Sequence, residues 1–169
     1  MRVDFFCFLD RGDLWSSITE LTRERGGMGG VYRIHAFRED ASREWRAANL
    51  VPVNRASEAD PLGRLYIGSA EVVTAGFIAL WRSLGSAQGT KDLEGPGRVY
   101  RDSPVLRRRF PRLCFTLRFD LRPSQAQAEE LAGYLACFGE LPPLNAALLN
   151  GQAWAGPAGT ARASLSAIA

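Results

Sequence analysis

Two short tyrosine motifs are the residues of this chain with the clearest capacity for chemistry. The first is Gly30-Val31-Tyr32, and the second is Leu65-Tyr66-Ile67-Gly68-Ser69. Each motif begins or ends a stretch with the pattern of a β-strand, so one small sheet would bring the two phenols side by side. Such a pair of tyrosines suggests a phosphodiester-cutting site. A phenol has a pKa of about 10, so the pair needs a nearby cation before it can act as a base.

Hydrolysis of a phosphodiester also needs a positive group beside the phosphate, an aimed water and a hard oxygen ligand for a metal ion. Late in the chain, a helical pattern carries Glu129 and Glu130, and Asn145 follows a Pro-Pro pair. Each has a plain structural alternative, because the glutamates can form a solvated helix face and Asn145 can cap a turn. Tyr32 and Tyr66 can likewise be core aromatics.

The positive charge of the chain comes almost entirely from arginine, because Lys91 is its only lysine. The net charge is +3. Arginine matches phosphate oxygens well, so this composition is compatible with a nucleic-acid partner. Biased codon usage is the simpler explanation of the composition alone, and the run Arg107-Arg108-Arg109 is also typical of a solvated helix face.

The composition is that of a globular protein with a real core. The chain has 169 residues, of which 46% are hydrophobic and 23% are charged, values that fit one compact domain. No stretch reaches the about 18–20 uninterrupted apolar residues of a membrane helix, so no membrane partner is expected. The first ten residues carry an acid within a short apolar run and indicate a strand, not a signal peptide.

Cysteine and histidine narrow the possible chemistry. Cys7, Cys114 and Cys137 are widely spaced, so they exclude a usual zinc site, make a disulfide framework unexpected, and are expected to be buried. A reducing, cytoplasmic setting is therefore expected. His35 is the only histidine, which rules out multi-histidine metal sites, and no G-x-S-x-G elbow accompanies it.

Apolar periodicity predicts the elements that must hold these residues. The expected strands cover residues 2–9, 31–37, 63–69 and 113–121, and the expected helices cover residues 13–25, 70–84, 103–110 and 123–138. Ser69 and Ser124 are expected to cap the second and fourth helices, and Gly139 to end the fourth. Long loops are expected over residues 38–61 and 85–97, and an extended exit over residues 140–145.

These elements predict an α/β protein of the α+β type, with a small mixed, mainly antiparallel sheet of about three to four strands flanked by helices. The expected division is an N-terminal strand and helix extension at 1–29, a main domain at 30–150, and a loosely held tail at 151–169.

The order of the motifs from Gly30 to Asn145 resembles the GIY-YIG nuclease superfamily. The chain is most similar to a bacterial branch with a long insert between the two tyrosine motifs. Arg55, Asp60 and Gly63 precede the second motif as in that branch, and the run Phe138-Gly139-Glu140-Leu141-Pro142-Pro143-Leu144-Asn145 matches its ending.

The resemblance implies hydrolysis of a DNA phosphodiester with one divalent metal, Mg²⁺ or Mn²⁺. Tyr32 and Tyr66 would lie at the reacting phosphate. A glutamate of the late helix would hold the metal, with Glu130 preferred over Glu129. Asn145 would support the metal site, and an arginine on the helix after the second motif would stabilise the phosphate.

The chain departs from the family pattern where the phosphate would be held. Gly76 occupies the position of the expected arginine, and Arg82 is the only basic candidate on the same helix. In the family branch, a histidine precedes a Gly-x-x-Tyr motif. This chain keeps the motif as Gly97-Arg98-Val99-Tyr100, but Glu94 stands at the position of the histidine. A negative charge facing a phosphate would hinder its binding.

Three hypotheses follow. The favoured one is a domain with a degenerate phosphodiesterase site that binds DNA or another nucleic acid with weak or no cleavage. Its phosphate contacts would be Arg98, Arg101, Arg107 and Arg108. The alternatives are an active Mg- or Mn-dependent endonuclease that uses Arg82 or an arginine between 101 and 112, and a module that binds a protein partner through the fold alone.

Overall fold

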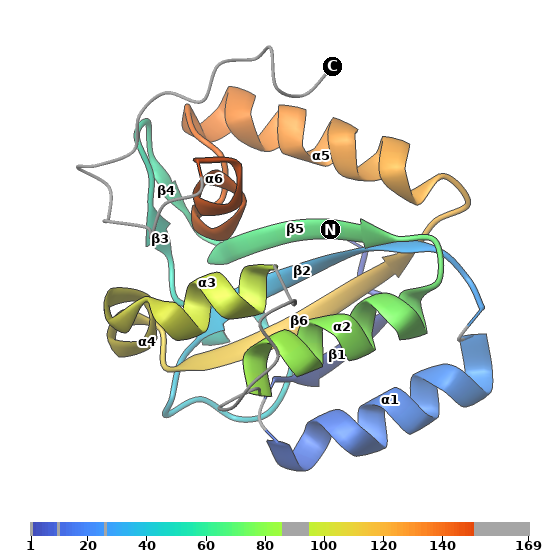
Figure 1. The fold of residues 1–169 in the computed structure, drawn as a ribbon. Coiled ribbons are helices and arrows are strands. Elements are labelled where there is room, and N and C mark those ends of the chain that lie inside the picture. The colour runs from blue at the N-terminus through green and yellow to red at the C-terminus, as the bar shows by residue number, and fades with distance from the viewer. Residues whose placement is uncertain (1, 10, 26, 86–94, 151–169) are drawn as a thin grey trace.

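The computed structural model describes residues 2–9, 11–25, 27–85 and 95–150 (Figure 1). The predicted C-terminal tail, from about residue 151, and Glu94 lie outside these residues. Within them, no helix is long and apolar enough to cross a membrane.

The centre of the molecule is a four-stranded antiparallel sheet, which confirms the predicted α+β class. The strands are β1 (Phe5–Phe8), β6 (Arg112–Phe119), β2 (Gly30–Phe37) and β5 (Arg64–Ala70), in this order across the sheet. A second, two-stranded sheet pairs β3 (Val53–Asn54) with β4 (Ala59–Asp60), inside the stretch predicted as a long loop. Strand β1 pairs with β6, so the residues before Gly30 extend the main sheet as an edge strand.

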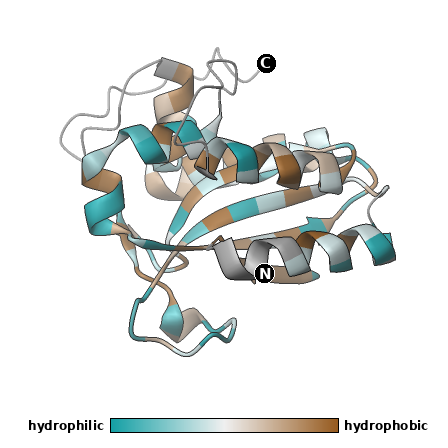
Figure 2. Cartoon of the chain, turned by 60° about the horizontal axis from the view of Figure 1, so that its bottom comes forward, coloured by the Kyte–Doolittle hydropathy of each residue, from teal (hydrophilic) through white to brown (hydrophobic). Residues whose placement is uncertain are grey.

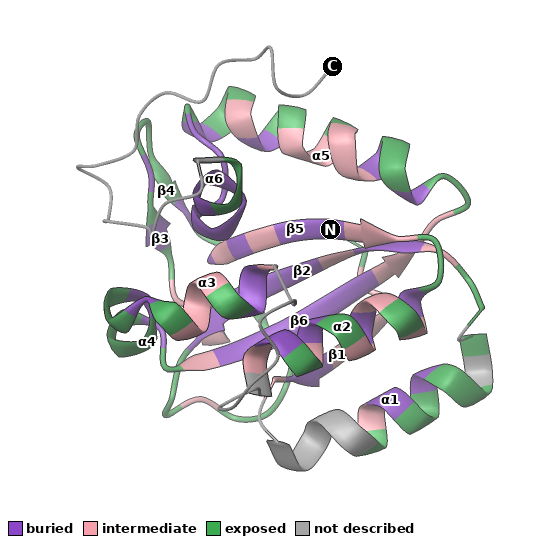
Figure 3. Ribbon diagram, in the orientation of Figure 1, coloured by how far each residue is buried: buried purple, intermediate pink, exposed green. Residues whose placement is uncertain are grey.

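Helices cover both faces of the sheet. The helices are α1 (Arg11–Arg25), α2 (Val73–Gly85), α3 (Pro96–Asp102), α4 (Pro104–Arg109), α5 (Pro123–Phe138) and α6 (Pro143–Asn150), with a 3₁₀ turn η1 (Ala47–Asn49). Ile18 of α1 and Phe77 of α2 share one hydrophobic core with Ile34 of the sheet. Tyr134 of α5 packs with Val31 on the opposite face. Figure 3 shows the sheet as the most buried part of the fold.

Strand β2 alternates as predicted. Its even-numbered side chains Tyr32, Ile34 and Ala36 belong to the core beneath α1 and α2, whereas Val31 packs toward α5. Successive side chains of a strand point to opposite faces, so Arg33 and His35 lie on the α5 face. This alternation decides which candidate residues can meet.

Several predicted helix ends were wrong. Helix α2 begins at Val73, and Ser69 does not cap it, because its hydroxyl donates to Gln127 Oε1 at 2.6 Å. Ser124 donates to Glu71 Oε1 at 3.0 Å, and the N-cap residue of α5 is Arg122, without a capping side chain. In contrast, Gly139 ends α5 with φ +73°, as predicted.

Three other expectations also differ from the structure. Helix α6 begins at Pro143, within the predicted extended exit, because proline suits the first turn of a helix. Helix α3 begins at Pro96, inside the loop predicted for residues 85–97. Cys7 and Cys114 are buried, but Cys137 is exposed on α5.

Gly63, in the turn into β5, provides a test of the fold. It has φ +58°, and an added Cβ would lie 2.3 Å from the carbonyl oxygen of Val51. Gly63→Ala should therefore lower the free energy of unfolding by more than about 2 kcal/mol, measured by urea denaturation. Gly133→Ala is the control, because Gly133 lies in α5 with no atom within 4 Å of an added Cβ. It should stabilise the protein by about 0.5–1 kcal/mol; equal effects would contradict this account.

Candidate functional site

The two tyrosines lie side by side, as the motifs predict. Tyr32 pairs with Gly68 across β2 and β5, and Tyr66 lies opposite Ile34. Their ring centroids are 5.9 Å apart. A Cβ at Gly68 would lie within 2.7 Å of both rings. Glycine is therefore required at this position, because both rings lie against its Cα.

The surroundings of the two phenols make them poor bases. Burial raises the pKa of Tyr32, and the neighbouring Tyr66 raises it further. Burial also raises the pKa of Tyr66, and the hydrogen bond with Tyr32 offsets this only in part. Within the described residues, no guanidinium acts to lower either pKa. Both side chains therefore remain neutral phenols near neutral pH.

The position expected to hold a phosphate-clamping arginine faces the tyrosines but has no room for a side chain. A Cβ at Gly76 would lie 3.9 Å from Cε1 of Tyr32 and only 2.6 Å from Cβ of Ala70. Arg82 is exposed in the last turn of α2, six residues or about 9 Å of helix further on. The clamp is therefore missing where the phenols meet.

Glu130 lies on the other face of the sheet. Its two carboxylate oxygens accept hydrogen bonds from Nε and Nη2 of Arg33, which is only 2% exposed. Because Arg33 follows Tyr32 in β2, their side chains point to opposite faces. The sheet thus separates Glu130 from both tyrosines. Glu129 is exposed and accepts a hydrogen bond from Gln125 at 2.9 Å.

The residues present do not fit the metal site that the resemblance implies. Both oxygens of Glu130 are held by a guanidinium, and Glu129 faces solvent on the same helix. Among the described residues, no group of three or more histidine, cysteine, aspartate or glutamate side chains is placed to hold a metal ion. We therefore derive no chemical step through a metal at this site.

Asn145 closes the edge of the sheet. Its side-chain oxygen accepts from the backbone N–H of Ile67 and its amide nitrogen donates to the carbonyl of Ile67, both at 2.9 Å. Gln127 of α5 donates to the same carbonyl at 3.3 Å. These amides occupy the outward-facing N–H and carbonyl of Ile67 in edge strand β5, which blocks pairing with another chain at this position.

The two segments that carry the family resemblance contact each other. Arg55 lies 3.1 Å from a carboxylate oxygen of Glu140 and donates to the carbonyl of Leu141. Asp60 accepts two hydrogen bonds from the Arg64 guanidinium, at 3.0 and 3.1 Å. That guanidinium lies 4.7 Å from the centre of the Tyr134 ring. This polar cluster fastens the β3–β4 hairpin to the end of α5, so these residues build the scaffold.

The remaining candidate arginines lie on three helices, α2, α3 and α4, which contact one another in sequence. Helix α3 is fixed to the end of α2, because Arg101 donates to the carbonyl of Ser83 at 3.2 Å. Helix α4 follows directly, with Ser103 accepting from the N–H of Leu106. We call the resulting surface the α2–α4 arginine surface. It consists of Arg82, Arg98, Arg101, Arg107, Arg108 and Arg109.

Asp102 is the one acidic residue among these helices that pairs with the surface, at 3.4 Å from both Arg98 and Arg101. Both ion pairs are solvent-exposed, so they are weak and easily exchanged.

No protein-family model, curated protein or solved structure matches the chain. The function is therefore inferred from the geometry of the site.

The Arg33–Glu130 pair gives a prediction for stability. Glu130→Ala leaves the buried Arg33 guanidinium without its counter-charge, and should lower the free energy of unfolding by about 3–5 kcal/mol. Glu129→Ala removes the same kind of charge from an exposed neighbouring position and should change stability by less than about 0.5 kcal/mol. Urea denaturation of both variants measures the difference. Similar, small effects would show that Glu130 is not needed to compensate Arg33.

His35 gives a prediction for pH dependence. It is completely buried; Nδ1 donates to the carbonyl of Leu62 at 2.8 Å, and Nε2 accepts from the Thr116 hydroxyl at 2.9 Å. Burial lowers its pKa to about 4. The unfolded chain therefore binds more protons between about pH 6.5 and 4, so stability should fall by about 3 kcal/mol as the pH drops through this window. In His35→Gln, this part of the pH dependence measured by urea denaturation should disappear.

Proposed function

We propose that the domain binds nucleic acid through the α2–α4 arginine surface and does not use the tyrosine pair for cleavage. The proposal that the tyrosine pair does not cleave rests on one observation: the sheet separates Glu130 from Tyr32 and Tyr66. The first part rests on the placement of the exposed arginines.

The arrangement around the tyrosines lacks the groups that phosphodiester hydrolysis requires. A missing donor to the developing negative charge costs about 3–4 kcal/mol of transition-state stabilisation. Gly76 supplies no such donor, and Arg82 lies further along the helix. The raised pKa values of the phenols remove the remaining candidate base. These features together favour a degenerate site over an active endonuclease.

The α2–α4 arginine surface has the charge and side-chain type that suit a phosphate backbone. Residues 95–112 contain six arginines and one aspartate. Arg112 is not part of the surface, because its Nη1 donates to the carbonyls of Arg38, Glu39 and Ala41. Arginine forks bind phosphate oxygens in two-point contacts. At the left of Figure 2, hydrophilic segments mark α3 and α4.

Removing two of these arginines should weaken nucleic-acid binding and its salt dependence. For Arg107→Ala/Arg108→Ala, we expect the slope of log K against log salt to become less negative by about 1–2, measured with single-stranded and duplex DNA by fluorescence anisotropy. Arg38→Ala/Arg46→Ala is the matched control. It removes the same charge from exposed positions in the loop after β2 and should leave the slope unchanged. Equal losses in both variants would indicate a nonspecific effect of net charge.

The same proteins should leave supercoiled plasmid intact in the presence of Mg²⁺ or Mn²⁺. Tyr66→Phe is the informative variant here, because Glu130→Ala is expected to destabilise the fold. Cleavage by the wild-type protein that disappears in Tyr66→Phe would overturn the degenerate assignment and support an active endonuclease. Absence of salt-sensitive DNA binding would contradict the first part of the proposal and would point to a protein partner.

A further inference from the structure

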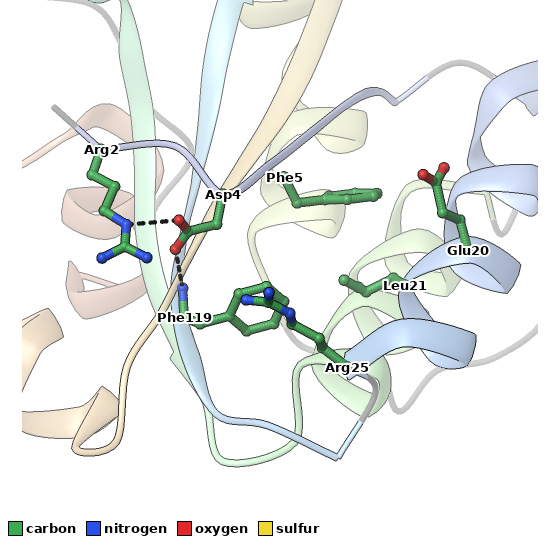
Figure 4. A pocket seen from close by; sticks show the side chains of 7 residues that line it. All are labelled: Arg2, Asp4, Phe5, Glu20, Leu21, Arg25 and Phe119. Atoms are coloured by element: carbon green, nitrogen blue, oxygen red, sulfur yellow. Dashed lines mark hydrogen bonds and ion pairs between the residues drawn. The ribbon is translucent and has the colours of Figure 1, made fainter.

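A separate pocket lies between α1 and the start of β1 (Figure 4). It is a cavity of about 230 Å³. Phe5, Leu21 and Phe119 supply its apolar walls, and its polar lining comes from Arg2, Asp4, Glu20 and Arg25. None of these residues takes part in the tyrosine pair or in the α2–α4 arginine surface. The pocket therefore needs its own explanation.

The apolar walls of the pocket present flat surfaces. The rings of Phe5 and Phe119 are both partly exposed. The Arg25 guanidinium lies 5.2 Å from the centre of the Phe119 ring, so a planar cation covers one aromatic face. Figure 4 shows Phe5 on one side of the pocket and the Arg25–Phe119 pair on the other. Aromatic rings and arginine planes are the surfaces on which nucleic-acid bases stack in proteins.

The polar lining offers both acceptors and donors. Asp4 accepts from Arg2 Nε at 2.7 Å and from the N–H of Phe119 at 3.0 Å. Burial opposes ionisation of Asp4, but these hydrogen bonds and the positive charges of Arg2 and Arg25 outweigh it and lower its pKa. Asp4 is therefore an ionised acceptor near neutral pH. Among the described residues, neither the guanidinium of Arg25 nor the carboxylate of Glu20 has a hydrogen-bond partner.

The charge balance and size of the pocket narrow the class of ligand. Two arginines face two carboxylates, so the lining suits an uncharged ligand better than an anion or a cation. Its polar groups require donors and acceptors on the same ligand. Its volume is below the about 300–1,000 Å³ of usual ligand sites, which favours one small ring system. A nucleobase combines flat faces with an edge of donors and acceptors.

We propose that this pocket takes one unstacked nucleobase, which stacks between Phe5 and the Arg25–Phe119 pair and hydrogen-bonds through its edge to Asp4 and Arg2. The base can come from a free nucleoside or from a single strand. Only the second source rests on the proposed nucleic-acid binding, so the two are tested separately.

The first experiment uses neutral nucleosides, which carry no phosphate. Each of the four DNA nucleosides is titrated into ¹⁵N-labelled full-length protein, and amide shifts are followed by NMR. We expect saturable shifts at Phe5, Leu21 and Phe119. Arg25→Ala should weaken this binding about tenfold by removing a stacking surface. Arg23→Ala is the matched control, because it removes the same charge from an exposed site on α1 that does not line the pocket; it should bind as the wild type does.

The second experiment compares an oligothymidine strand with an abasic strand of equal length. Arg25→Ala should weaken binding of oligothymidine about tenfold relative to Arg23→Ala, and should leave binding of the abasic strand equal in the two variants. Nucleoside binding without strand binding would support the pocket and identify free nucleosides as its ligand, while contradicting the proposed nucleic-acid binding. Absence of nucleoside shifts at the pocket, together with equal losses of oligothymidine binding in both variants, would overturn the inference.

Discussion

The buried ion pair between Arg33 and Glu130 is the constraint around which this fold is arranged. A guanidinium in the middle of a central strand is costly to bury unless a carboxylate meets it. Helix α5 supplies that carboxylate, and its aromatic side chains then cover the same face of the sheet. The pair therefore fixes which side of the sheet α5 occupies. It also uses the carboxylate that a metal at the tyrosine site would have needed.

The tyrosine pair lies in a packed environment. Tyr32 stacks on Phe115, with ring centroids 5.5 Å apart, and both tyrosines contact the main hydrophobic core. Gly68 contacts both rings closely, and Gly76 packs tightly against Ala70, so the phenols are held in place. They nevertheless remain poor bases. The two phenols are thus held close together, while burial raises the pKa of each.

Much of the polar chemistry of the chain serves the scaffold. Asn145 and Gln127 bind the outward backbone groups of Ile67 in β5, and Arg55 joins the hairpin to the segment after α5. Through these contacts, the segment around Arg55 and the segment after α5 hold each other in place. Arginines lie at the surface in several parts of the chain, and those of α2, α3 and α4 follow one another along helices that contact each other.

The sequence by itself determined the strands of the main sheet, their two faces and the end of α5 at Gly139, because these depend on apolar alternation and on backbone conformation within a few residues. It also placed Tyr32 beside Tyr66. Only the tertiary structure decided the partners of Ser69 and Ser124, whose hydroxyls bind residues 58 and 53 positions away instead of capping their own helices. It also decided the face on which Glu130 lies. A helical pattern shows that a glutamate is on a helix, but the side of the sheet that the helix covers depends on burying Arg33, ninety-seven residues earlier in the chain.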